Sequence, residues 1–81
     1  MMIIQVLGHS SICLKIYDVI AEIIRKTKKK NIQLEMVRDI SQFGIKDAES
    51  AVIIDGQLIL KDTIPTIEQI NEWFNQNTLH L

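Results

Sequence analysis

Residues 3–13 read Ile-Ile-Gln-Val-Leu-Gly-His-Ser-Ser-Ile-Cys, and this stretch decides the fold of the 81-residue chain. Residues 3–7 are a short apolar run that ends at Gly8, which is the pattern of a buried strand. From Ser10 or Ser11 onward, apolar residues recur at helical spacing. A serine is a good helix cap because its hydroxyl can accept a hydrogen bond from a free first-turn N–H. The stretch therefore predicts a strand, a tight turn and a long helix.

The predicted helix has a wide apolar stripe along one side. Its members recur three and four residues apart: Ile12, Ile16, Val19, Ile20, Ile23 and Ile24. Cations gather in the last turn, where they complement the negative end of the helix dipole. Asn31 follows them and tolerates the left-handed conformation that commonly ends a helix, so we expect the helix to end there.

The middle of the chain predicts three further strands and a short helix. Residues 32–36 alternate apolar and polar side chains, as in a half-buried strand. Asp39 and Gly44 have the positions of a cap and a stop for a short helix. Two apolar runs flank Asp55-Gly56, which is a strong hairpin signal because both central residues of a type I′ turn need a positive φ.

The last helix is predicted to begin after Pro65. Thr66 and Gln69 have the spacing of a capping box, in which two side chains and two backbone N–H groups pair reciprocally. An apolar face follows: Ile67, Ile70, Trp73 and Phe74. We expect the tail after about residue 75 to be flexible.

The element order β-α-β-α-β-β-α predicts one α/β domain over residues 1–81. The first strand, the first helix and the second strand form a right-handed parallel unit, and the hairpin adds two antiparallel strands. We therefore expect a four-stranded mixed sheet flanked by helices on both faces, which is the minimal thioredoxin-like arrangement.

Composition excludes several classes of protein. The chain is 47% hydrophobic and 23% charged with a net charge of −1, so no global field draws it to nucleic acid or to an anionic membrane. No apolar run approaches the ~20 residues that a membrane helix needs. Cys13 is the only cysteine, which excludes an internal disulfide framework and fits a cytoplasmic location.

The order and spacing of these elements resemble the very small thioredoxin-like proteins of bacteria and archaea, often called redox-active disulfide or glutaredoxin-like proteins. Such chains pass from a strand through a Leu-Gly-x-Gly-Cys-x-x-Cys-like turn into a long helix. Residues 7–13 are similar to that turn shortened by one residue. Residues 43–45, 51–56 and 64–70 resemble the later Tyr-Gly-Val, strand–Asn-Gly and Val-Pro-Ser/Thr elements. The similarity covers residues 3–75 and implies a thioredoxin-like fold.

The resemblance also implies where a redox site would lie. With the shortened turn, Ser10 takes the position of the family's nucleophilic cysteine and Cys13 that of its second cysteine. Without the shortening, Ser11 and Leu14 replace both cysteines. We prefer the first register because it places three residues on the family's apolar stripe: Ile16, Ile20 and Ile23. In both registers the nucleophile is replaced by serine, so we expect disulfide reductase activity to be lost.

A second departure concerns the cis-proline that such proteins place before the third strand, facing the active site. Glu49 and Ser50 stand at that place, and the only proline is Pro65. A non-prolyl cis peptide costs about 3–4 kcal/mol, so we expect a trans bond and a substrate groove of different shape. The resemblance implies that this groove is formed by Gly8, His9, Ser11, Glu49 and Ser50.

Cys13 leaves two interpretations open. Near a helix N-terminus the dipole favours a thiolate, which could form mixed disulfides. One turn inside the helix, Cys13 would instead be a small covered residue. Ser10 cannot replace a thiol without an adjacent base, and nothing in the sequence orients His9 as one. Cys13, His9, Asp18 and His80 do not have the spacings of a zinc site, so we expect no metal and no cofactor.

Two functions are therefore predicted. The first is a divergent single-thiol protein of the cell-redox type. The second is a non-catalytic protein-binding module on a thioredoxin-like scaffold, with a protein partner or a homodimer across an exposed strand edge. An anion or small-ligand pocket at residues 8–11 is a further alternative, for which the sequence offers little support. We interpret one basic cluster as a solvated helix end or a contact for an acidic partner or phosphate: Arg25, Lys26, Lys28, Lys29 and Lys30.

Overall fold

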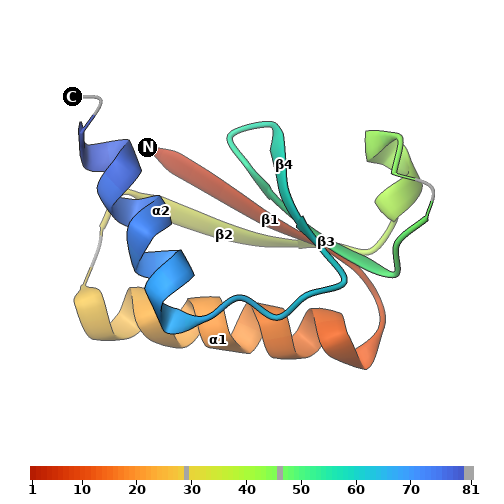
Figure 1. The fold of residues 1–81 in the computed structure, drawn as a ribbon, viewed down its shortest axis with the longest axis horizontal. Coiled ribbons are helices and arrows are strands. Elements are labelled where there is room, and N and C mark those ends of the chain that lie inside the picture. The colour runs from red at the N-terminus through yellow and green to blue at the C-terminus, as the bar shows by residue number, and fades with distance from the viewer. Residues whose placement is uncertain (29, 46, 80–81) are drawn as a thin grey trace.

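A computed structural model describes residues 1–28, 30–45 and 47–79 of the chain. Its elements are, in chain order, β1 (Met2–Gly8), α1 (Ser11–Thr27), β2 (Ile32–Val37), the 3₁₀ helix η1 (Ile40–Phe43), β3 (Ser50–Ile54), β4 (Gln57–Lys61) and α2 (Ile67–Leu79). The strands form one sheet in the order β2-β1-β3-β4 (Figure 1). β1 is parallel to β2 and antiparallel to β3, and β3 is antiparallel to β4. The predicted α/β class and four-stranded mixed sheet are confirmed.

Both long helices pack on the same face of the sheet. Alternate residues of the two central strands meet α1 and α2 in one core: Met2, Ile4, Val6, Cys13, Ile16, Ile20, Ile23, Val52, Ile54, Ile70 and Phe74. Figure 1 shows α1 running beneath the sheet and α2 rising beside the second half of α1. None of the described helices is long and apolar enough to cross a membrane.

The prediction that helices cover both faces of the sheet is confirmed only in part, because both long helices lie on one face and only the short η1 lies on the other. On the second face, Leu7, Ala51 and Ile53 are buried under Ile40 of η1 and the nearby Ile45, together with Val37 of β2. The physical reason is length. Asp39 and Gly44 bracket only four helical residues, so the predicted short helix is a single 3₁₀ turn and covers little of this face.

The start of η1 follows the predicted capping chemistry. The Asp39 carboxylate accepts a hydrogen bond from the backbone N–H of Ser41 at 3.0 Å. Gly44 ends the turn at φ 73°, in the left-handed region that favours glycine. Both residues have the roles that the sequence predicts.

The C-terminus of α1 differs from the prediction. The left-handed residue is Lys28, at φ 55°, where the sequence predicted Asn31. Asn31 already belongs to the approach to β2, because its carbonyl oxygen accepts from the backbone N–H of Met2 at 2.8 Å. The cations Arg25 and Lys26 lie in the last turn as expected, whereas Lys29 lies outside the described residues.

The hairpin and the final helix confirm their sequence signals. Asp55 and Gly56 have φ values of 49° and 86°, as a type I′ turn requires. Thr66 and Gln69 form the predicted capping box, with hydrogen bonds of 2.9 and 3.1 Å. α2 is helical through Leu79, beyond the point where we expected a flexible tail, and the flexibility itself stays a prediction.

Candidate functional site

The turn between β1 and α1 brings Gly8 and Cys13 against Glu49, which comes from a distant part of the chain. Gly8 has φ 118°, in a region that side chains rarely adopt. A Cβ at this position would overlap both the Sγ of Cys13 and the carbonyl oxygen of Glu49. Glycine is therefore required here twice over, by the backbone conformation and by the close approach of α1 and the residue before β3.

Ser10 is the N-cap residue of α1, but its hydroxyl does not cap the helix. Its backbone is extended, with φ −80° and ψ 170°, as an N-cap requires. The Oγ atom is buried and has no hydrogen-bond partner. The expected bond to a first-turn N–H is therefore absent, which corrects the prediction. No described base forms a hydrogen bond with this hydroxyl, and the neighbouring His9 is exposed.

Cys13 lies one turn into α1 and has no exposed surface. Its Sγ is 2.8 Å from the carbonyl oxygen of Leu7, to which the thiol donates a hydrogen bond. The carbonyl oxygen of Glu49 is a more distant second acceptor at 3.7 Å. Both contacts use the thiol proton, which a thiolate would not have. Of the two interpretations of Cys13, its placement matches that of a covered packing residue.

The structure also bears on the two registers of the turn. With Ser10 at the cap, the side chains buried on α1 include Cys13 and the stripe Ile16, Ile20 and Ile23. Leu14, which takes the second-cysteine position in the other register, is 60% exposed. Cys13 therefore lies on the buried side of α1 and Leu14 on its exposed side.

Asp62 organises the segment where the family's cis-proline is expected, and the sequence analysis missed it. One oxygen of its carboxylate accepts from the backbone N–H groups of Glu49 and Ser50, at 2.8 and 2.9 Å. The Ser50 hydroxyl lies 3.3 Å from the same oxygen. Asp62 has φ 52°, and its own N–H donates to the Ser50 carbonyl oxygen at 3.0 Å. The described residues contain no cis peptide bond.

A weak sequence signal for Asp62 did exist. It directly follows the last strand residue, Lys61, and aspartate is among the few side chains that visit the left-handed region. That signal indicates a turn but does not identify the backbone groups that the carboxylate would bind. Those groups are more than ten residues away, at the start of β3 and at the residue before it.

Two hollows flank the turn. One of about 340 Å³ is lined by Gly8, His9, Ser10, Ile40, Ala48 and Glu49. The other, of about 330 Å³, is lined by Gly8, His9, Cys13, Leu14, Met36 and Arg38. The structure thus brings together three of the predicted groove residues, Gly8, His9 and Glu49. The other two differ, because Ser11 is an exposed first residue of α1 and Ser50 is buried against Asp62.

Among the described residues, no three His, Cys, Asp or Glu side chains gather closely enough to hold a metal ion. His80, which the sequence analysis considered as a ligand, lies outside the described residues.

Near the site, two hydrogen bonds from Ser41, first from its hydroxyl and then from its backbone, lower the pKa of the exposed Asp39 below its usual 3.8.

Within the described part of the chain, this arrangement offers two concave surfaces and a buried thiol, and no base is hydrogen-bonded to the Ser10 hydroxyl. Such a site can bind a partner, whereas covalent catalysis needs an accessible and activated nucleophile. Comparison of the chain with protein-family models, with curated proteins and with solved structures found no match.

Proposed function

We propose that this chain is a thioredoxin-like domain that acts as a non-catalytic protein-binding module. The observation that carries the proposal is the placement of Cys13, which is fully buried and whose thiol donates a hydrogen bond to the carbonyl oxygen of Leu7. In this proposal Cys13 stabilises the turn between β1 and α1. The alternative, a single-thiol redox protein, is the weaker candidate for the same reason.

Several features support the thioredoxin-like part of the proposal. The order of elements is the expected one, with β1, α1 and β2 forming a parallel unit and the β3–β4 hairpin leading to α2. Ser10 is the N-cap residue of α1, and Cys13 follows it by three positions. The two cysteines of the thioredoxin-like proteins that the chain resembles have the same spacing at the start of the helix. Glu49 lies against this turn. In the thioredoxin-like proteins that the chain resembles, the cis-proline segment faces the same turn. The main departure is the middle helix, reduced to the 3₁₀ turn η1.

The contacts of Cys13 argue against a redox cycle. Thiol–disulfide exchange needs a thiolate that can reach the disulfide of its substrate. Cys13 is covered, and its nearest acceptor is a backbone carbonyl oxygen. Ser10 occupies the nucleophile's place, and the hydroxyl has no described base to activate it. A mixed disulfide would therefore require local opening of the turn.

The surroundings of the turn support a binding role. Asp62 fixes the backbone at Glu49 and Ser50 through two N–H groups, so this wall of the hollow is held in place without a proline. A surface that is already ordered loses less conformational entropy when a partner binds. The hollow that Gly8 and Glu49 line is therefore a pre-formed concave surface for a partner.

The direct test is the rate at which iodoacetamide alkylates Cys13 in the native protein, followed by mass spectrometry. Each 1.4 kcal/mol of opening free energy slows labelling about tenfold, so we expect native Cys13 to react far more slowly than the urea-unfolded chain. The matched control is the double variant Cys13→Ala, Leu14→Cys. It carries its thiol on the exposed neighbouring position, and we expect it to react at nearly the unfolded rate.

A second measurement addresses catalysis. Reduction of insulin disulfides with dithiothreitol as the reductant should be no faster with the wild-type chain than with Cys13→Ala. Turnover above that control, or native Cys13 labelling as fast as the Leu14→Cys variant, would overturn the proposal in favour of the single-thiol redox protein.

A further inference from the structure

One of the two hollows beside the turn presents large apolar side chains to solvent. This hollow, of about 330 Å³, is lined by residues from the start of α1 and the end of β2. Leu14 lines it from α1 and Met36 from β2, and the two residues are 60% and 36% exposed. Methionine is flexible and polarisable, so it adapts to partners of different shape. We call this surface the Leu14–Met36 hollow.

Arg38 also lines the Leu14–Met36 hollow, and its charge has no partner within the described part of the chain. It is exposed, and none of the described carboxylates lies within ion-pair distance of its guanidinium. The nearest acids in the sequence are engaged elsewhere. Glu35 accepts a hydrogen bond from the side chain of Gln5 at 3.2 Å, and Asp39 accepts one from the backbone N–H of Ser41 at 3.0 Å. The guanidinium is therefore available to a ligand.

The rest of the Leu14–Met36 hollow adds to its positive character. Its described lining contains no acidic residue, and His9 is a second basic side chain in it. The first turn of α1 contains no acidic residue either, so the positive end of the helix dipole is not compensated there. The neighbouring hollow differs, because Glu49 belongs to its lining. An acidic ligand therefore suits the Leu14–Met36 hollow better than its neighbour.

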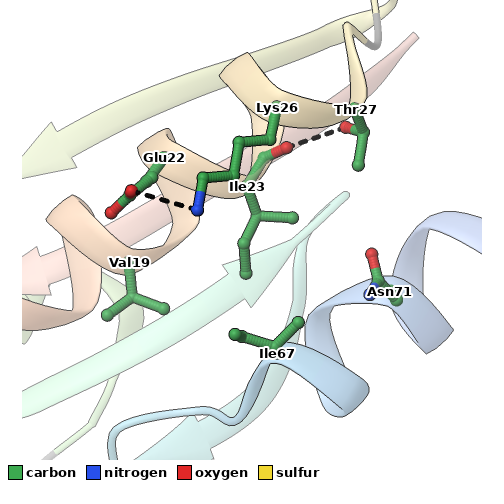
Figure 2. A pocket seen from close by; sticks show the side chains of 7 residues that line it. All are labelled: Val19, Glu22, Ile23, Lys26, Thr27, Ile67 and Asn71. Atoms are coloured by element: carbon green, nitrogen blue, oxygen red, sulfur yellow. Dashed lines mark hydrogen bonds and ion pairs between the residues drawn. The ribbon is translucent and has the colours of Figure 1, made fainter.

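The groove between the two long helices has no comparable charge to offer. It has a volume of about 320 Å³, and Figure 2 shows Val19, Ile23 and Ile67 directed into the shared space. The cation in its described lining, Lys26, is already paired with Glu22 at 3.4 Å (Figure 2). This groove is therefore apolar without a feature that selects the charge of a partner.

We propose that the Leu14–Met36 hollow binds a short segment of a partner protein in which an aliphatic side chain stands next to an aspartate or glutamate. Sites for small ligands span roughly 300–1,000 Å³, so a hollow of this size accepts one or two side chains. The aliphatic side chain packs against Leu14 and Met36. The carboxylate accepts two parallel N–H hydrogen bonds from Arg38, whose planar fork matches it. The inference rests on the proposed function and deepens it by naming the chemistry of the partner.

Selection of short random peptides on the immobilised full chain tests the proposal without assuming a sequence. The peptides are acetylated and amidated, so that only side chains supply carboxylates. We expect the retained peptides, identified by mass spectrometry, to be enriched in Asp or Glu next to Leu, Ile or Met. The variant Arg38→Glu should lose this enrichment, because it places a like charge against the carboxylate. A wild-type chain that retains no peptide, or retains peptides without acidic enrichment, would overturn the proposal.

Variants then assign the surface, with fluorescence anisotropy of the most enriched peptide as the measurement. Arg38→Gln removes a hydrogen-bonded charge, and we expect it to raise the dissociation constant at least about tenfold. Leu14→Ser should weaken binding by a similar factor. Arg25→Gln and Leu58→Ser are the matched controls, because both residues are exposed and neither is among the lining residues of the hollow. A loss as large with Arg25→Gln as with Arg38→Gln would place the peptide on the basic end of α1 and contradict the proposal.

Three further measurements complete the test. Circular dichroism of every variant separates lost binding from lost folding. Inorganic phosphate that displaces the peptide as effectively as unlabelled peptide does would indicate a simple anion site and contradict a protein partner. Alkylation of Cys13 in the same samples keeps the two proposals distinct. A chain that binds no peptide but has a slowly reacting thiol contradicts only the proposed partner, whereas a reactive thiol contradicts the proposed function.

Discussion

The two long helices begin in opposite ways, although each follows a residue with a hydroxyl side chain. At α2, the Thr66 hydroxyl accepts from the N–H of Gln69, and the Gln69 side chain accepts from the N–H of Thr66. At α1, Ser10 has the N-cap backbone conformation, but its buried hydroxyl has no partner. The same local signal thus gives a complete cap at one helix and an unsatisfied one at the other.

The difference shows what fixes each helix. The start of α2 is determined by residues four apart or fewer. The start of α1 is determined by tertiary contacts, in which Gly8 admits the Cys13 sulfur and the Glu49 carbonyl oxygen to the same small space. A buried polar group without a partner costs about 1–3 kcal/mol. Positions where local rules are broken at such a cost are often functional or strained sites, which agrees with placing the candidate site here.

The largest effect is expected from Gly8→Ala, which tests the tertiary contacts at α1. The left-handed backbone costs about 1–3 kcal/mol for a residue with a side chain, and overlap with Cys13 and Glu49 adds about 1–3 kcal/mol. We expect a loss of unfolding free energy of about 2–6 kcal/mol in urea titrations. Gly44→Ala is the matched control, because Gly44 also has a positive φ but a Cβ there meets nothing within 4 Å. Equal losses in the two variants would contradict this account.

Thr66→Ala breaks the complete cap and should have the next largest effect. The substitution removes the acceptor for the Gln69 N–H, and loss of a threonine cap typically costs about 1 kcal/mol. Thermal and urea unfolding measure the change. Thr63→Ala removes a nearby exposed hydroxyl that bonds only the Lys61 carbonyl oxygen, and it serves as the control. An effect of Thr66→Ala no greater than this control would argue against the capping box.

Ser10→Ala is the counterpart at α1 and should change little. The hydroxyl has no hydrogen bond to lose, and its removal relieves a buried polar atom of its desolvation cost. We expect the unfolding free energy to stay within about 0.5 kcal/mol of the wild type or to rise. Because Ser10 and Thr66 are compared under identical conditions, a loss as large as that of Thr66→Ala would show that Ser10 does cap α1 in solution.

Sequence patterns predicted the features that depend on neighbouring residues. The Asp55-Gly56 turn, the Thr66–Gln69 box and the bracketing of η1 by Asp39 and Gly44 all involve residues at most five positions apart. Turn and cap chemistry acts over that range, so composition and spacing suffice.

The features that the sequence did not predict depend on long-range contacts. The bonds from Asp62 to Glu49 and Ser50 cross twelve or more positions, and nothing near Asp62 indicates its targets. The placing of both long helices on one face of the sheet also escaped prediction, because it depends on which face α2 packs against and not on a local pattern. In the candidate site, Gly8, His9 and Glu49 line one hollow, whereas Ser11 and Ser50 do not line it, although Ser50 pairs with Gly8 in the sheet.

The smallest effect concerns a third helix start, that of η1, where Asp39 is the cap. Hydrogen bonds from the hydroxyl and the N–H of Ser41 lower the pKa of Asp39 below its usual 3.8. A carboxylate whose pKa is lower in the folded state adds stability above its unfolded pKa, and this stability is lost as the pH falls through the folded value.

Asp39→Asn has no such titration. The difference in melting temperature between wild type and Asp39→Asn should therefore be steady near neutral pH and shrink in acid below the usual 3.8. Because Asp39 is fully exposed, added salt should reduce the difference as well. A difference that stays constant into acid would show that the cap acts without its charge, as the hydroxyl of Thr66 does at α2.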